Sequence, residues 1–572
     1  MNYKQLYNSW LKDERLINEA KLELQALTDE KDIEYRFGAE LEFGTAGMRG
    51  ILGYGTNMMN VYTVKRASQG LATYIKSLGK SAMERGVAVS YDTRLNSELF
   101  ARATAGVLLS NGIKVTIFEK ASPVPMLSYA VRETGAVAGV MITASHNPKE
   151  YNGYKVYGED GAQMSPEATS EVVKYISEIT DYLSVSAPIL EKIAKTNGLT
   201  VLGEDFTDKY VSALTKLSLS QKAVKEFGEK LKIVYTPLHG TGYIPVMKVL
   251  KKLGINVSVV KEQVKEDPSF STVEVPNPEN TEAMTLGVKL ANDIGADVVF
   301  GTDPDSDRLG VAIRNDLGEF INLTGNQVGV LLADYVLKRL KQENALPKNG
   351  VIVKSFVSTG MVKPVCEEYG VSLVEVPVGF KYIGEKIKLY EKTLEKTYLF
   401  GFEESCGYLR GTHARDKDAV VASMLFAEMV CYYEYTNTTV YKVLQNLYKK
   451  HGFVLDKTVS IAFKGLSAMK DMASVVEKMR NTSLKEVEGE KISAVRDYLS
   501  GVRTLSSKET EKLDISGVNC IYYELEKGGF ICLRPSGTEP KLKVYYSVTA
   551  SDAESATELV NKLINGFSNL LK

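Results

Sequence analysis

A serine, a histidine and a lysine follow one another closely after an apolar segment. Residues 136–143 are small and apolar, which predicts a buried strand, and Ser145, His146 and an Asn-Pro turn come next. A serine on a loop at a strand end is held by a rigid sheet and open to a ligand. Lys155 comes ten residues later and could fold back onto the same loop. The stretch therefore combines a hydroxyl that could carry a transferred group with two side chains that could move protons.

A serine next to a histidine is not sufficient evidence for this chemistry. Adjacent residues on an extended chain point to opposite faces, so adjacency does not make a Ser-His dyad, and a simple turn with a packed histidine is the alternative. The flanking residues also lack the G-x-S-x-G pattern of a hydrolase. The chemical interpretation depends on the cation and phosphate sites that other segments supply.

Three aspartates occupy alternate positions after a predicted strand at residues 296–300: Asp303, Asp305 and Asp307. A loop tightened by a proline could bring their carboxylates onto one hard cation. The loop is not an EF-hand, because Arg308 replaces its glycine and Arg314 replaces its bidentate glutamate. A D-x-D motif whose first aspartate is itself phosphorylated is an alternative. Carboxylates this close repel one another unless a cation binds them, so we expect a metal site rather than a solvated acidic turn.

Three further loops place glycine beside groups that bind phosphates or sugars. Residues 44–50 include Arg49, which could reach a phosphate, although the Gly-Lys-Ser/Thr of a Walker A loop is missing. Residues 401–408 hold carboxylates and a hydroxyl suited to vicinal sugar hydroxyls, and Lys417 adds a nearby donor. Residues 534–540 offer an arginine, two hydroxyls and glycine-freed N–H groups for an anion. Each loop alone is also compatible with a polar turn.

The composition limits the kinds of partner. The chain has 572 residues, 44% hydrophobic and 25% charged, with a formal net charge of −1. No overall positive field exists to hold nucleic acid or an anionic membrane, so we expect neither as a partner. The first residues are polar and no run of about 18 apolar residues occurs, which argues against a signal peptide or a transmembrane helix. Five scattered cysteines without C-x-x-C spacing favour reduced thiols and a cytoplasmic location.

An internal repeat indicates what positions these loops. Residues 87–117, 232–257 and 351–374 each contain a strand, a polar loop, a helix, a glycine and a second strand. The glycine suits a helix end, and the short apolar runs suit parallel strands buried on both faces. Residues up to about 40 are charged and helical in pattern. The region from about 456 lacks the repeat and alternates Lys/Glu-rich helical segments with short strands.

These patterns predict an α/β protein with three related mixed α/β domains and a C-terminal α+β domain. The expected domains are 1–205 with the Ser145 loop, 206–325 with the aspartate loop, 326–455 with the loop at 401–408, and 456–572 with the anion loop.

Taken together, the loops resemble those of the α-D-phosphohexomutase family, specifically its phosphoglucomutase and phosphopentomutase branch. The motifs occur in the family's order along nearly the whole chain: T-A-S-H-N-P with N-G-Y-K, D-P-D-S-D-R, E-E-S and R-P-S-G-T-E-P. The resemblance implies that the four domains surround a central cleft. One departure is Val378, at a position before Gly-aromatic-Lys where family members often carry threonine. The lost hydroxyl bears on sugar preference rather than on the reaction.

The resemblance also implies roles for individual residues. Ser145 would be the phosphoserine and would also contact Mg²⁺, whose other ligands would be the three aspartates. The residues lining the phosphoserine pocket would be Arg49, His146, Lys155 and Arg308. The residues contacting the sugar would be Glu403 and Ser405, with Gly379, Lys381 and Lys417 as further substrate contacts. The residues holding the non-reacting phosphate would be Arg534, Ser536, Gly537 and Thr538.

The implied reaction interconverts α-D-glucose 1-phosphate and glucose 6-phosphate through a phosphoserine enzyme and a glucose 1,6-bisphosphate intermediate, which also serves as activator. Mg²⁺ would take up charge on the phosphoryl oxygens, and Lys155 or His146 would act as base. The bisphosphate must turn around, so we expect a fourth domain that closes and reopens. Mannose and pentose phosphates are alternative substrates. A Mg²⁺-dependent phosphatase with Asp303 as nucleophile and a non-catalytic sugar-phosphate sensor are alternative functions. A monomer or dimer is expected.

Overall fold

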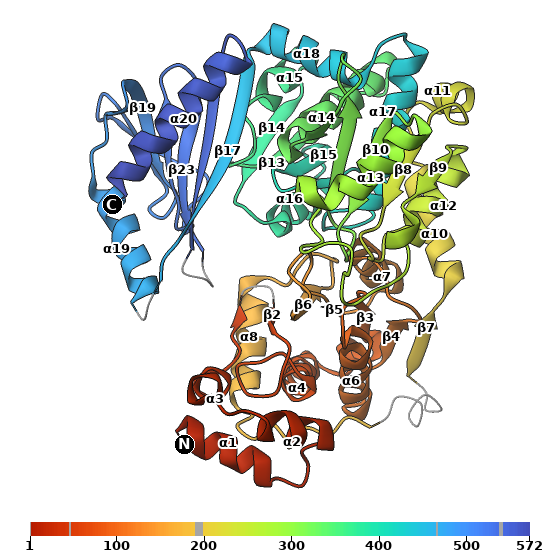
Figure 1. Cartoon of the computed structure of the whole chain (residues 1–572), viewed down its shortest axis with the longest axis vertical. Helices are drawn as coiled ribbons and strands as arrows, with labels where there is room; N and C mark the ends of the chain where they lie inside the picture. The colour runs from red at the N-terminus through yellow and green to blue at the C-terminus, as the bar shows by residue number, and fades with distance from the viewer. Residues whose placement is uncertain (1, 45–46, 189–197, 465–466, 537–540, 572) are drawn as a thin grey trace. The chain divides into compact units, whose positions relative to one another are not determined.

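The computed structural model describes residues 2–44, 47–188, 198–464, 467–536 and 541–571. These residues form four β-sheets flanked by helices (Figure 1). The chain divides into two compact units. Unit 1 comprises Met1–Thr324, Ile383–Leu394 and Ser405–Asn437, and unit 2 comprises Gly325–Tyr382, Glu395–Glu404 and Thr438–Lys572.

Three helices precede the first sheet, as the charged helical pattern of the first 40 residues predicts: α1 (Tyr3–Lys12), α2 (Asn18–Gln25) and α3 (Glu30–Phe37). Asn2 and Asp29 cap α1 and α3 by accepting a hydrogen bond from a first-turn N–H. Trp10 meets Phe37 edge-on, with 5.5 Å between the ring centroids, in an apolar cluster that includes Tyr62 of the next helix. This cluster attaches the N-terminal helices to the first domain.

The first sheet has seven strands in the order β1-β2-β6-β5-β3-β4-β7. The elements in chain order are β1 (Phe43–Gly44), β2 (Gly47–Ile51), α4 (Val61–Ser77), α5 (Lys80–Arg85), β3 (Val87–Tyr91), α6 (Ser97–Ser110), β4 (Val115–Phe118), α7 (Val124–Thr134), β5 (Ala138–Ile142), β6 (Tyr151–Gly158), α8 (Pro166–Ser177) and β7 (Leu199–Leu202). β3 runs parallel to β4 and β5, whereas β6 runs antiparallel to β5 and β2. The sheet is therefore mixed, as predicted.

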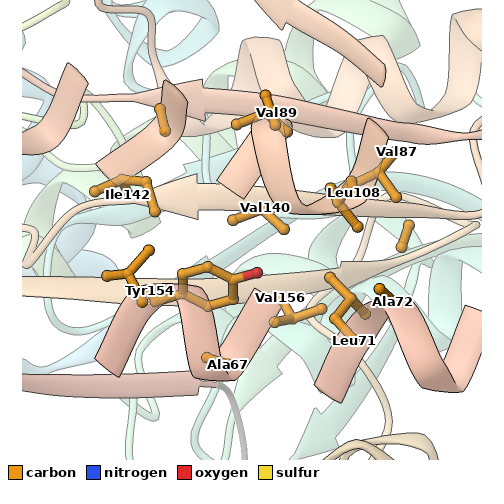
Figure 2. Close-up of a cluster of buried hydrophobic side chains, with 14 of the residues drawn as sticks. Ala67, Leu71, Ala72, Val87, Val89, Leu108, Val140, Ile142, Tyr154 and Val156 are labelled. Carbon is orange, nitrogen blue, oxygen red and sulfur yellow. The ribbon is translucent and has the colours of Figure 1, made fainter. Parts of the chain in front are cut away.

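Apolar side chains line up across this sheet because the strand register places them side by side. Val89 pairs with Val140, and Val140 pairs with Val156. Figure 2 shows these three valines in a row, with Leu71 of α4 and Leu108 of α6 packed against the strands. All five side chains are at most 1% exposed. Their removal from water stabilises the platform from which the loops after β3 and β5 project.

The second sheet, also in unit 1, has the order β12-β11-β10-β8-β9. Its elements and their helices are α10 (Glu204–Thr215), α11 (Gln221–Phe227), β8 (Ile233–Thr236), α12 (Tyr243–Leu253), β9 (Val257–Val259), the 3₁₀ turn η1 (Lys261–Gln263), α13 (Thr281–Ile294), β10 (Val298–Thr302), β11 (Leu309–Arg314) and β12 (Phe320–Leu323). Unit 1 also contains β16 (Gly407–Leu409) and α17 (Ala419–Tyr435). α17 is buried along nearly its whole length and packs against α11 and α12.

In unit 2 the strands β14, β13 and β15 lie side by side and run parallel. The elements of this part are α14 (Gly325–Gln342), β13 (Gly350–Ser355), α15 (Val362–Tyr369), β14 (Ser372–Val376), β15 (Thr397–Glu403) and α18 (Val440–His451). The helix α16 (Phe380–Thr393) begins in unit 2 and ends in unit 1.

The C-terminal sheet of unit 2 is antiparallel, in the order β17-β24-β23-β22-β19-β20-β21, with β18 paired to β19. Its elements are β17 (Phe453–Ala462), α19 (Ala468–Asn481), β18 (Glu486–Val487), β19 (Glu490–Asp497), β20 (Val502–Leu505), β21 (Thr510–Lys512), β22 (Ile521–Leu525), β23 (Gly529–Pro535), β24 (Lys541–Ala550) and α20 (Ala553–Leu570). Figure 1 shows α19 and α20 against this sheet, and their apolar residues share one buried cluster with its strands. The predicted α+β class of this region is confirmed.

The three predicted repeats have one arrangement in common: three parallel strands in the orders β4-β3-β5, β9-β8-β10 and β14-β13-β15. Gly254 and Gly370 end α12 and α15 in the left-handed conformation, as predicted for the glycine of the repeat. The predicted domain boundaries stay a prediction; residue 205 falls in α10, 325 at the start of α14 and 455 in β17. Among the described residues, no helix has the length and apolarity needed to cross a bilayer.

Candidate active site

Three aspartate side chains converge beyond the end of β10. Asp303, Asp305 and Asp307 each offer a carboxylate oxygen within 4.8 Å of the others. Ser306 takes a left-handed conformation with φ of 52°, and its N–H donates to the Asp303 carbonyl oxygen. The Asp303 Oδ1 accepts hydrogen bonds of 3.0 Å from the backbone N–H groups of Asp307 and Arg308. The tight turn thus directs three carboxylates toward one point.

The three carboxylates are buried but incompletely hydrogen-bonded. All three aspartates are at most 2% exposed. Within the described part of the chain, Asp305 Oδ1 and Asp307 Oδ1 have no hydrogen-bond partner. Burial, followed by repulsion from the other two carboxylates, raises the pKa of Asp303 well above its ordinary value. A divalent cation with oxygen ligands would satisfy the bare oxygens and offset the repulsion, so the cluster could hold a metal ion.

Two lysines supply part of the balancing charge. Lys155 Nζ lies 3.0 Å from Asp305 Oδ2, and Lys417 Nζ lies 3.1 Å from Asp307 Oδ2. Burial acts to raise the pKa of Asp305, but the Lys155 ammonium outweighs it and holds that pKa below its ordinary value. Lys417 can reach the cluster because Gly407 has no side chain, since a Cβ there would lie 2.1 Å from the Lys417 Cδ. The cluster is therefore flanked by cations that could also bind an anionic substrate.

Ser145 lies within reach of the same carboxylates. It takes a left-handed conformation, with φ of 53°, and its N–H donates to Thr143 Oγ1 at 2.8 Å. Its Oγ lies 3.1 Å from Asp303 Oδ2 and 3.1 Å from His146 Nδ1. Thr143 Oγ1 in turn donates to Asp305 Oδ2 at 3.1 Å. The loop after β5 therefore places the Ser145 hydroxyl between a carboxylate and an imidazole.

His146 is neutral in this environment. Burial, and then the positive charges of Arg308 and Arg49, lowers its pKa well below the ordinary value. A neutral imidazole has one nitrogen that can accept a proton and one that can donate. Because Nδ1 is the nitrogen beside Ser145 Oγ, His146 can exchange a proton with the serine hydroxyl.

Two arginines and the segment around Gly407 complete the unit 1 part of the site. Arg49, on β2, donates to Asn147 Oδ1 at 2.8 Å. Arg308 forms a β-bridge with Gly407, two residues after Ser405. Ser405 thus lies two residues from this bridge. Unit 1 contains nine further residues that the sequence singles out: Arg49, Ser145, His146, Lys155, Asp303, Asp305, Asp307, Arg308 and Lys417.

In unit 2, Glu403 holds the loop that precedes α16. Its Oε1 accepts a hydrogen bond of 2.7 Å from the Gly379 N–H, and Gly379 has a φ of 124°. Lys381 Nζ lies 5.0 Å from the centroid of the Tyr382 ring. Val378 packs against an apolar cluster that includes Tyr522. Glu403 and Gly379, far apart in sequence, are thus joined directly.

Arg534 and Ser536 lie at the end of β23 in the same unit. Burial acts to lower the pKa of Arg534, but Tyr545 outweighs it and raises that pKa, so the guanidinium stays charged. The Ser536 N–H donates to the Lys541 carbonyl oxygen at 2.8 Å. Gly537 and Thr538, also expected to bind phosphate, lie outside the described residues. The described part of this loop offers one cation and one hydroxyl.

Two contributors to the site were not in the predicted set. Thr143 begins the T-A-S-H-N-P motif, but its hydrogen bonds to Ser145 and Asp305 form only in the folded chain and are not visible in the sequence. Arg94 donates to the carbonyl oxygens of Ser145 and Asn147 from a loop 51 residues earlier than the serine. The only sequence signal for Arg94 is a polar Asp-Thr-Arg directly after a strand.

The sequence matches the profiles of one protein family over most of its length. The Phosphoglucomutase/phosphomannomutase profiles match residues 40–183 as alpha/beta/alpha domain I, 208–318 as domain II, 324–451 as domain III and 481–565 as the C-terminal domain. A phosphoglucomutase of Staphylococcus haemolyticus is 36% identical over 536 residues, 93% of this chain and 95% of that protein. A phosphoglucomutase of Staphylococcus aureus strain N315 is 36% identical over 540 residues, 94% of this chain and 95% of that protein.

Solved structures share the fold. The Paramecium phosphoglucomutase pp63/parafusin, in its open form, aligns with a TM-score of 0.68 at 17% identity, over 93% of this chain and 95% of that chain. A phosphoglucomutase/phosphomannomutase family protein from Burkholderia thailandensis aligns with a TM-score of 0.67 at 17% identity, over 93% of this chain and 96% of that chain. At this identity the two structures establish a common architecture.

Proposed function

The chain belongs to the phosphoglucomutase/phosphomannomutase family, and we propose that it interconverts α-D-glucose 1-phosphate and glucose 6-phosphate. The observation that carries the proposal is the position of Ser145 Oγ, 3.1 Å from a buried cluster of three carboxylates. A phosphoryl group stored on this hydroxyl would lie beside the one place in the described chain where three acidic side chains could hold a metal ion. Curated relatives of nearly the same length are phosphoglucomutases, which favours glucose as the sugar.

We assign Mg²⁺ to the three aspartates and to the Ser145 oxygen. The donor set is all oxygen, which suits a hard cation, and the bare Asp305 and Asp307 oxygens are the unsatisfied groups it would bind. When bound, Mg²⁺ would withdraw charge from the phosphoryl oxygens and so make an unreactive serine ester transferable.

The proposed transfer exchanges one oxygen–phosphorus bond for another. A sugar hydroxyl attacks phosphoserine, its bond to phosphorus forms, and the bond between Ser145 Oγ and phosphorus breaks. The sugar hydroxyl loses one proton and Ser145 Oγ gains one, so glucose 1,6-bisphosphate forms without a net change in protons. We assign this exchange to His146, which as a neutral imidazole would accept a proton at Nε2 while it donates one from Nδ1, 3.1 Å from Oγ, whereas the Lys155 ammonium is paired with Asp305. The bisphosphate then returns its other phosphoryl group to Ser145.

The remaining predicted residues are proposed to hold the substrate. Arg534 and Ser536 would bind the phosphate that is not reacting, since charge-assisted bonds from arginine suit a phosphate. The proposed sugar contacts are Gly379, Lys381, Glu403, Ser405 and Lys417. Added glucose 1,6-bisphosphate would act as activator, because enzyme that has lost its phosphoryl group needs a donor to regain it.

An aspartyl nucleophile is less compatible with the contacts. Asp303 Oδ1 already accepts two backbone hydrogen bonds, and Oδ2 accepts one from Ser145 Oγ. The Mg²⁺-dependent phosphatase with Asp303 as nucleophile would have to break these contacts before reacting.

The bond between enzyme and phosphate tests the proposal. The wild-type protein, incubated with labelled glucose 1,6-bisphosphate and Mg²⁺, should acquire a label that hydroxylamine does not remove, because hydroxylamine cleaves acyl phosphates and not serine esters. Ser145→Ala should lose both label and isomerisation, whereas Ser170→Ala, at an exposed serine of α8, should keep both. Coupled assays with glucose, mannose and ribose 1-phosphates identify the sugar. Hydroxylamine-sensitive label, or full activity of Ser145→Ala, would overturn the proposal.

A further inference from the structure

One arginine binds most of the backbone of the loop that carries Ser145. The guanidinium of Arg94 donates hydrogen bonds to the carbonyl oxygens of Ser145 at 2.6 Å, Pro148 at 2.9 Å and Tyr151 at 3.1 Å, and also to that of Asn147. The arginine is 3% exposed. Four carbonyl groups within seven residues are therefore directed at a single side chain.

Only arginine could make these contacts. Its planar guanidinium carries five N–H donors in a fixed fork, whereas a lysine ammonium has three donors at one point. The fork is held in place by Asp92, whose carboxylate is ion-paired with Arg94 Nε at 3.3 Å and accepts a hydrogen bond from Ser97 Oγ at 2.7 Å. Both side chains of the ion pair are fully buried. Arg94 is therefore a fixed point on the first sheet to which the Ser145 loop is attached.

The same guanidinium also contacts the segment that follows β9. The Phe270 ring lies over Arg94, 5.0 Å from its Cζ. Phe270 is 1% exposed and has a left-handed φ of 45°, which a bulky residue rarely adopts without support. His239 provides support, because its ring nitrogens bond the Lys265 carbonyl oxygen at 2.9 Å and Thr272 Oγ1 at 2.8 Å. Arg94 thus touches both the Ser145 loop and the domain that carries the aspartates.

We propose that Arg94 is a positioning residue that holds the Ser145 loop, through its carbonyl groups, in the one backbone conformation that serves both phosphoryl transfers. The inference rests on the proposed function of Ser145. Ser145 must be an acceptor in one transfer and a donor in the other, so its oxygen has to occupy the same place with and without phosphate. The left-handed backbone of Ser145 is strained for a serine, and four bonds from one buried fork would keep it populated.

The test compares Arg94→Lys with a matched substitution, Arg66→Lys. Arg66 is also a buried arginine of the first domain, and its guanidinium donates to the Ile179 carbonyl oxygen, the Tyr182 hydroxyl and Glu40 Oε2. None of these three partners is a residue of the candidate site. Each variant is purified as the full chain and assayed with glucose 1-phosphate, Mg²⁺ and glucose 1,6-bisphosphate. The measurements are kcat, KM, melting temperature and the extent of serine labelling.

Arg94→Lys should lower kcat by about tenfold to a hundredfold, the scale of a misplaced reacting group, while KM changes by less than about twofold. Arg66→Lys should lower the melting temperature by a similar amount and leave kcat of the folded protein unchanged. Equal kcat in the two variants, once corrected for folded fraction, would overturn the assignment. Should Arg94→Lys not fold, Phe270→Leu decides: a lower kcat at unchanged KM supports the proposal, and wild-type kcat refutes it. An inactive wild-type protein would instead refute the function proposed for Ser145.

Discussion

Replacing Asp303 by asparagine should stabilise the protein when no divalent cation is present. The pKa of Asp303 is raised well above its ordinary value by burial and by its two acidic neighbours, so the charged carboxylate is disfavoured in the metal-free folded protein. The asparagine side chain has the same shape, and its oxygen can still accept the two backbone hydrogen bonds that Asp303 Oδ1 accepts. Asp303→Asn therefore removes the charge without removing the turn.

The size of the effect follows from proton linkage. Each pKa unit by which folding raises the pKa of Asp303 costs about 1.4 kcal/mol of stability once the pH exceeds the folded pKa, and a neutral asparagine avoids this cost. We expect a gain of about 1.4 kcal/mol for each pKa unit, and an increase in melting temperature of roughly 1–2 °C per kcal/mol for a unit of this size. A raised folded pKa means that wild-type stability falls as pH rises above the unfolded pKa. The advantage of asparagine should therefore grow from pH 5 to pH 7.

Thermal unfolding of both proteins, once with a chelator and once with Mg²⁺, measures the stability gain of Asp303→Asn. Mg²⁺ at a hundredfold excess over Kd should stabilise the wild type by about 2.7 kcal/mol and stabilise Asp303→Asn far less. The stability difference between the two proteins should therefore shrink or change sign when Mg²⁺ is added. Asp418→Asn is the control, since that buried carboxylate caps α17 through the Val420 and Val421 N–H groups and should destabilise under both conditions. An Asp303→Asn protein that melts below the wild type in chelator at pH 7 would show that the carboxylates do not repel as argued.

Three other substitutions test separate parts of the site. Lys155→Met removes the ammonium paired with Asp305 and should lower kcat by about 10²-fold or more without preventing serine labelling, as steady-state and single-turnover assays would show. Gly407→Ala puts a Cβ where the Lys417 stem lies and should lower kcat about tenfold; an unchanged kcat would exclude Lys417 from the reaction. Arg534→Ala should raise KM for glucose 1-phosphate by about tenfold to a hundredfold, because it removes charge-assisted hydrogen bonds to the phosphate. Inorganic phosphate should also inhibit this variant less than it inhibits the wild type.

The repeat could be predicted because its signals are local. Each copy has an apolar run for a strand and a glycine for a helix end, and residues such as Gly254 and Gly370 take the left-handed conformation that these positions require. The aspartate turn is also local, because alternate spacing and a proline act within five residues.

The contacts between loops could not be predicted, because they depend on how strands are ordered. The Arg94 fork and the Ser145 carbonyl meet only because β3 and β5 are neighbours in the sheet. The Thr143 bond to Asp305 joins residues 162 apart in sequence, and no pattern in either segment indicates it. Residue types and spacing suggest which chemistry a loop can support, whereas tertiary packing decides which loops work together.

The path of the chain has a consequence for synthesis on the ribosome. Unit 1 includes Ile383–Leu394 and Ser405–Asn437 as well as the first 324 residues, so it lacks α17 and Lys417 until about 110 further residues have been translated. At typical translation rates this delay lasts on the order of 10 s, during which the surfaces of α11 and α12 that receive α17 stay uncovered on the nascent chain. A fragment ending at residue 324 would keep Ser145 and the aspartates yet expose those surfaces permanently, and should therefore require chaperones or aggregate.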